Sequence, residues 1–139
     1  MTNQLTIEYG AVAKHEDLSE EVHADRLLEE IRRIKRRFED GLDAPYGVDV
    51  VNDRGDRMTI GFDEHEGFLM FQPSSDQEWT RYSLGEVKRN DSKVFYLPQW
   101  TEVSAKYMVP TPKLLEALQD WVRSGEFSDK IEWTTELFL

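Results

Sequence analysis

Cysteine is absent from this 139-residue chain. Its absence excludes disulfides and thiolate-bound metals, and it is typical of proteins in a reducing compartment. No apolar run approaches the roughly 20 residues that a membrane-spanning helix needs. The first residues, Met1 to Gln4, contain no basic region followed by an apolar stretch, so no secretory signal is visible. We therefore expect a cytoplasmic protein that does not enter a membrane.

Basic residues are scarce, since 17 Lys and Arg stand against 28 Asp and Glu for a net charge of −11. This balance argues against nucleic-acid binding, which requires neutralised phosphates. The same charge would attract a basic protein partner and speed association. A requirement for solubility alone would explain the negative charge equally well. With 39% hydrophobic residues, the chain is expected to fold as one domain, residues 1–139, around a real core.

Residues that could carry out a reaction are also missing. The three histidines, His15, His23 and His65, lie in separate segments, and no phosphate-binding Gly-rich loop or Gly-x-Ser-x-Gly sequence occurs. A zinc-dependent nucleobase deaminase needs cysteine ligands. Asp63 and Glu66 beside His65 could touch a metal, but hard cations need more converging oxygens than this spacing guarantees. We expect no enzyme activity, no cofactor and no metal.

The first third of the chain predicts a strand followed by a long helix. Residues 5–13 have the apolar spacing of a strand. Asp17, with Glu20 three residues later, matches a capping box at a helix start. The helix is expected over residues 18–40, and Gly41 can close it in a left-handed conformation.

The middle of the chain predicts short strands joined by tight turns rich in Gly, Asp and Ser. The expected strands are residues 48–51, 57–62, 68–71 and 79–84. The expected turns are residues 53–55, 63–67 and 73–76. Consecutive strands with short turns indicate an antiparallel sheet.

The last third predicts two more strands, a helix and a closing strand. Residues 93–97 form a β-branched and aromatic run that Pro98 ends, and residues 100–108 alternate like a second strand. Thr111 suits a helix N-cap and Pro112 the first helical position. The buried stripe of this helix is expected to be Leu114, Leu115, Leu118, Trp121 and Val122, with Gly125 as its stop and Ile131 and Trp133 in the closing strand. The fold class is therefore α+β, with six to seven antiparallel strands and an N-terminal and a C-terminal helix on one face.

Tryptophans beside carboxylates are the best candidates for a binding role. Tryptophan is a frequent interface anchor, and a nearby carboxylate can pair with Arg or Lys of a partner. Two such pairs are Glu78 with Trp79 and Trp100 with Glu102. Both tryptophans could instead cap the sheet core, whereas Trp121 and Trp133 are expected inside it. The acidic turn is a third candidate contact, or merely solvated: Asp63, Glu64 and Glu66.

The ordered motifs of residues 57–133 resemble immunity protein family one of bacterial polymorphic toxin systems. The motifs are Met58-Thr59-Ile60-Gly61, Tyr82-Ser83-Leu84-Gly85, Phe95-Tyr96, Gln99-Trp100-Thr101-Glu102, Val109-Pro110, Gly125 and Glu132-Trp133. The resemblance implies a protein that neutralises a cognate toxin by binding it, and such proteins are often paired with deaminase-type toxins that act on nucleic acids. A toxin of that kind would present a basic surface. The alternative is a small acidic interaction or adaptor domain unrelated to toxins.

Overall fold

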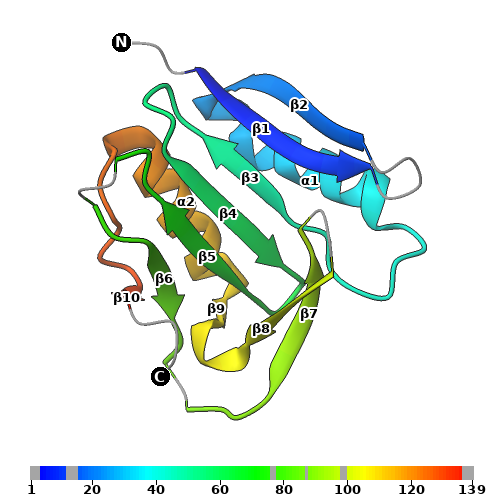
Figure 1. The fold of residues 1–139 in the computed structure, drawn as a ribbon, viewed down its shortest axis with the longest axis vertical. Helices are drawn as coiled ribbons and strands as arrows, with labels where there is room; N and C mark the ends of the chain where they lie inside the picture. The colour runs from blue at the N-terminus through cyan, green and yellow to red at the C-terminus, as the bar shows by residue number, and fades with distance from the viewer. Residues whose placement is uncertain (1–3, 12–15, 76–77, 87, 98–99, 136–139) are drawn as a thin grey trace.

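A large antiparallel sheet forms the centre of the protein in the computed structural model (Figure 1). The structure describes residues 4–11, 16–75, 78–86, 88–97 and 100–135. The strand order is β10-β6-β5-β4-β3-β1-β2, and β9 pairs with the start of β5. The strands of this sheet are β1 (Gln4–Ala11), β2 (Glu16–His23), β3 (Val48–Val51), β4 (Arg57–Phe62), β5 (Glu66–Gln72), β6 (Arg81–Leu84), β9 (Val109–Pro110) and β10 (Glu132–Thr134).

Two helices, α1 (Leu27–Glu39) and α2 (Thr111–Ser124), share one hydrophobic core with the sheet. Both lie behind the sheet in Figure 1. The sheet contributes alternate residues to this core, because successive side chains of a strand point to opposite faces. The central members are Ile7, Ile31, Ile34, Val50, Ile60, Leu69, Leu114 and Leu118. Trp121 is buried among them and Trp133 packs against them, as the sequence predicts.

A separate two-stranded hairpin, β7 (Ser92–Tyr96) and β8 (Trp100–Ser104), crosses the opposite face of the sheet. A second, smaller core lies beneath it and contains Phe68, Phe95, Ala105, Tyr107 and Met108. Gly61 allows this close approach, since a Cβ there would stand 2.8 Å from the rings of both Phe68 and Phe95. The predicted α+β class, the antiparallel sheet and the two helices are confirmed.

The number of strands is larger than predicted, with eight in the main sheet of the described residues and two in the hairpin. The main error is the N-terminal helix. Glu16–His23 forms strand β2, paired with β1 along its whole length, and a 3-10 turn (Ala24–Arg26) precedes α1. Asp17 and Glu20 therefore do not cap a helix. The ladder with β1 offers these residues eight paired positions, which outweighs their weak local helix signal.

Smaller corrections apply to the last third. The strand predicted over residues 100–108 ends at Ser104, and a 3-10 turn (Ala105–Tyr107) follows. Thr111 is the first residue of α2 rather than its N-cap, and its hydroxyl donates to the backbone carbonyl of Asp63 at 2.9 Å. Gly125 ends α2 in the left-handed conformation, as predicted. The predictions for Val12, Ala13, His15, Asp76 and Pro98 lie outside the described residues.

Candidate functional site

The hairpin β7–β8 is fixed to the sheet at both ends. At the end near its turn, Tyr96 exchanges backbone hydrogen bonds with the chain before β3: its N–H donates to Pro45, and its carbonyl accepts from Gly47, both at 3.0 Å. At the other end, the N–H of Gly85, which directly follows β6, donates to the carbonyl of Lys106 at 2.7 Å. Between them, the Phe95 ring meets Phe68 edge-on at 5.0 Å. The hairpin is therefore a rigid support for the side chains on its outer surface.

The hairpin face, defined as Ser92, Val94, Trp100 and Glu102, points away from the sheet. Val94 and Trp100 are 41% and 54% exposed, although both are large hydrophobic residues. Val94 stands opposite Glu102 across the hairpin, and Glu102 is exposed with no ion pair to another described residue. The predicted alternation of residues 100–104 is thus confirmed. Apolar area beside an uncompensated carboxylate suits contact with a basic protein surface.

Trp100 rests on a row of aromatic rings that leads into the core. Its ring meets Tyr96 edge-on at 5.4 Å, Tyr96 stacks with Tyr46 at 5.9 Å, and Tyr46 stacks with Phe38 at 5.7 Å. The Tyr46 hydroxyl donates to the carbonyl of Gly10, and burial raises the Tyr46 pKa well above its usual value. These contacts hold Trp100 in place without covering it. It does not cap the sheet core.

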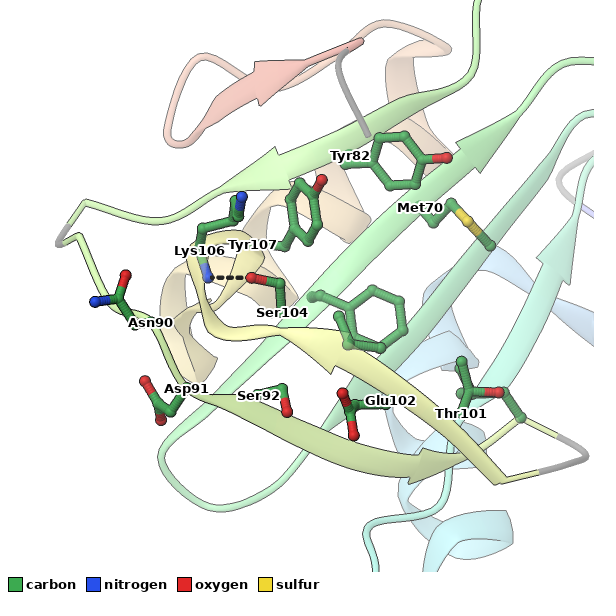
Figure 2. Close-up of a pocket in the computed structure, with 13 residues that line it drawn as sticks. Met70, Tyr82, Asn90, Asp91, Ser92, Thr101, Glu102, Ser104, Lys106 and Tyr107 are labelled. Carbon is green, nitrogen blue, oxygen red and sulfur yellow. Dashed lines mark hydrogen bonds between the residues drawn. The ribbon is translucent and has the colours of Figure 1, made fainter. Parts of the chain in front are cut away.

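An open groove of about 710 Å³ lies beside the hairpin. Figure 2 shows β7 on one side of β8 and the side chains of Met70, Tyr82 and Tyr107 on the other. Met70 and Tyr82 stand opposite each other on β5 and β6, so they share one face of the sheet. The remaining lining residues are Phe68, Asn90, Asp91, Ser92, Leu97, Thr101, Glu102, Val103, Ser104 and Lys106. The groove has an apolar floor with polar side chains along β8.

The acidic turn is largely neutralised within the molecule. Lys93 reaches Asp63 at 2.5 Å and Glu66 at 3.1 Å. Arg89 reaches Glu66 at 2.5 Å and Asp91 at 2.6 Å. These pairs join the turn between β4 and β5 to the segment that enters β7, so Asp63 and Glu66 help to position the hairpin. Glu64 is exposed and has no ion pair with another described residue.

Acid is expected to weaken this ion cluster. Burial raises the pKa of Asp63, but the Lys93 ammonium and the backbone N–H groups of Glu66 and His65 oppose it and lower the pKa from 3.8 to about 2. Because the pKa is lower in the folded state, Asp63 stabilises the fold fully above about pH 5, and this contribution is lost as the pH falls toward about 2. Urea unfolding at these two pH values should show a smaller loss of stability in Asp63→Asn than in the wild type. Equal losses in both proteins would contradict the assignment.

Glu78 and Trp79 lie at the other end of the sheet. They come after β5 and before β6, at the end where Gln72 pairs with Arg57, the first residue of β4. Strand β7 of the hairpin instead passes near the end of β4, where a Cβ on Gly61 would meet the Phe95 ring. Trp79 is 74% exposed and therefore does not cap the core. The structure brings Trp100 and Glu102 together and leaves Glu78 and Trp79 apart from them.

Two features of the site, the exposed Val94 and the groove, were not identified from the sequence. Val94 alternates with the buried Phe95, which could have placed it on the outer side of the hairpin. The groove has no comparable signal, because Met70, Tyr82 and Tyr107 come from three separate elements. Within the described ranges, no three His, Asp or Glu side chains are grouped to hold a metal ion. The site offers surface for contact and hydrogen bonding.

The comparison with protein families decides what kind of protein carries this site. The model of "Immunity protein Imm1" matches residues 14–135, which is most of the chain. The chain belongs to the Imm1 family. The Imm1 match extends further toward the N-terminus than the motifs that begin at Met58, and it includes strand β2 and helix α1.

A comparison of this Imm1 chain with curated proteins found no match. Membership of the Imm1 family indicates a role in immunity to a toxin. Neither helix among the described residues has the length and apolar character required to cross a bilayer.

Proposed function

We propose that this protein is the cytoplasmic immunity partner of one cognate bacterial toxin of a polymorphic toxin system and neutralises it by stoichiometric binding, without catalysis. Membership of the Imm1 family carries this proposal. The hairpin face supports it, because two exposed hydrophobic side chains, Val94 and Trp100, flank Glu102 on a rigid hairpin, and the Glu102 carboxylate has no ion pair with another described residue. Interfaces are typically built around such aromatic anchors with charged neighbours.

The toxin surface that fits is basic. A toxin that acts on a nucleic acid, such as the deaminase type that the family resemblance implies, must hold phosphates with Lys and Arg. A protein of net charge −11 that covers this basic surface excludes the polyanionic substrate. Binding in the nanomolar range corresponds to about −12 kcal/mol, and close charge pairs in a desolvated interface couple by roughly 1.5–7 kcal/mol. One aromatic anchor and a few charge pairs can therefore supply the affinity.

Co-expression with the product of the neighbouring toxin gene tests this function directly. Cells that make the toxin alone are expected to stop growing, whereas cells that also make this protein are expected to grow, and the two proteins should co-purify at a fixed ratio. Growth arrest in both strains, with no co-purification, would reject the proposal. A catalytically silenced toxin supplies the material for affinity measurements.

The charge of Glu102 is expected to contribute to toxin binding. Glu102→Lys places a repulsive charge against a basic surface, and we expect at least a ten-fold loss of affinity, mostly as slower association at low salt. Glu102→Gln keeps the size of the side chain and should lose less. Both variants should melt like the wild type, because Glu102 has no ion pair with another described residue. Surface-binding kinetics at two salt concentrations measure the effect, and unchanged association rates would exclude Glu102 from the interface.

The other predicted contacts take different roles in this proposal. Glu64 lies beside the ion cluster, exposed to a partner that approaches the hairpin, whereas Asp63 and Glu66 act through Lys93 and Arg89. Glu78 and Trp79 would be contacted only by a toxin that reaches the other end of the sheet.

A further inference from the structure

Strand β8 has one edge that no strand covers in the described part of the chain. Its other edge is paired with β7 over five positions, from Tyr96↔Trp100 to Ser92↔Ser104. The open edge borders the groove, because Thr101, Glu102, Val103 and Ser104 all line it. Unpaired strand edges offer a row of backbone donors and acceptors to another chain.

The register shows which backbone groups are available. Asp91 and Ala105 stand opposite each other, one position beyond Ser92↔Ser104, and the Ala105 N–H donates to Asp91. Hydrogen-bonded and non-bonded pairs alternate along an antiparallel ladder. Thr101 and Val103 therefore bond to β7, whereas the backbone N–H and C=O groups of Glu102 and Ser104 point to the open edge.

The surroundings of this edge suit an added strand. A neighbouring strand would lie about 4.8 Å from β8, over the apolar floor that Met70 and Tyr82 provide. Strand β2, an edge of the main sheet, differs because it carries the acidic residues Glu20 and Glu21 side by side, and charge discourages pairing. Strand β8 carries a single charge, on Glu102.

We propose that an extended segment of the toxin docks on the open edge of β8 and becomes the third strand of the hairpin sheet. This proposal rests on the immunity function and specifies its binding mode, which is known in general as strand addition. Alternate side chains of the segment contact Met70 and Tyr82, and a basic side chain opposite Glu102 complements its charge. The toxin is thereby held through its backbone as well as through its side chains.

Ser104 offers a selective test. Its φ of −60° is already the value that proline requires, and its N–H points to the open edge, so Ser104→Pro removes one outward donor and spares the β7–β8 ladder. Ser104→Ala is the matched control, since it removes only the hydroxyl, which accepts from the Lys106 N–H at 3.4 Å. With silenced toxin from the neighbouring gene, we expect Ser104→Pro to bind about ten-fold to a hundred-fold more weakly than Ser104→Ala. Equal affinities of the two variants would overturn the proposal.

Amide exchange of the wild-type protein gives a readout that does not depend on a variant folding. Measured by NMR, the amides of Glu102 and Ser104 should exchange fast in the free protein and at least about ten-fold more slowly in the toxin complex. The amides of Thr101 and Val103 should be protected in both states. A tight complex in which Glu102 and Ser104 still exchange fast would overturn strand addition and leave the immunity function standing. Absence of any complex would reject both.

Discussion

Trp100→Ala is expected to lower toxin affinity about 100-fold and to leave the melting temperature nearly unchanged. The indole is 54% exposed and rests edge-on against Tyr96, so its removal opens no cavity in the core. Tryptophan anchors of this kind typically contribute 2 kcal/mol or more to binding. Calorimetric titration with silenced toxin and thermal unfolding of the free variant measure the two quantities.

Trp79→Ala is the matched comparison for this prediction. It removes the same side chain from a position that is 74% exposed, at the end of the sheet away from the hairpin. If the toxin contacts the hairpin alone, Trp79→Ala should bind like the wild type. Equal losses from both variants would mean that the toxin covers the whole sheet face, and normal affinity of Trp100→Ala would remove the hairpin face from the interface.

The strands of the middle of the chain were predictable because their signals are local. Apolar residues alternate with polar ones or follow one another directly in residues 48–51 and 57–62. Gly55 ends the turn between these strands with a φ of 86°, a conformation that glycine adopts at little cost. Helix α2 was equally clear from its apolar stripe and from Gly125. In these segments, local preference and tertiary structure favour the same result.

Strand β2 could not be predicted in this way, because its local pattern does not distinguish a helix from a strand. Leu18 and Val22 stand four residues apart, a spacing that suits one face of a helix and, equally, one face of a strand. What decides between them is pairing with β1, in which Tyr9↔Leu18 and Leu5↔Val22 face the same core. Such a long-range partner is not visible in the local pattern of Glu16–His23.

In the candidate site, too, features with a local sequence signal were predictable, whereas features that depend on long-range partners were not. Alternation along residues 100–104 placed Trp100 and Glu102 on one face, and the structure agrees. The pairing of the acidic turn was not foreseen, because Lys93 lies 30 residues after Asp63. The sequence therefore suggested more unpaired carboxylates at the site than the structure has. Asp63 and Glu66 form ion pairs within the molecule, whereas Glu102 has no such partner among the described residues.

Phe95→Ala is expected to have the largest effect on the fold and to abolish binding through it. Phe95 is fully buried and meets Phe68 edge-on at 5.0 Å, so its truncation should cost about 3–5 kcal/mol of unfolding free energy. The hairpin would also lose the anchor that holds β8 beside the groove, which should weaken toxin binding even under conditions where the variant is folded. Urea unfolding and titration with silenced toxin test the two effects.

Two further variants distinguish the loss of packing around Phe95 from a displacement of the hairpin. Phe95→Leu keeps most of the apolar volume and should lose much less stability than Phe95→Ala. Gly61→Ala fills the same space from the sheet side, where its Cβ would stand 2.8 Å from both rings, and overpacking of this kind costs about 1–3 kcal/mol. Because Gly61→Ala displaces the hairpin without touching its outer residues, reduced affinity in the folded variant would show that the toxin requires the hairpin in its observed place. Normal affinity would show instead that the toxin recognises the hairpin residues wherever the sheet holds them.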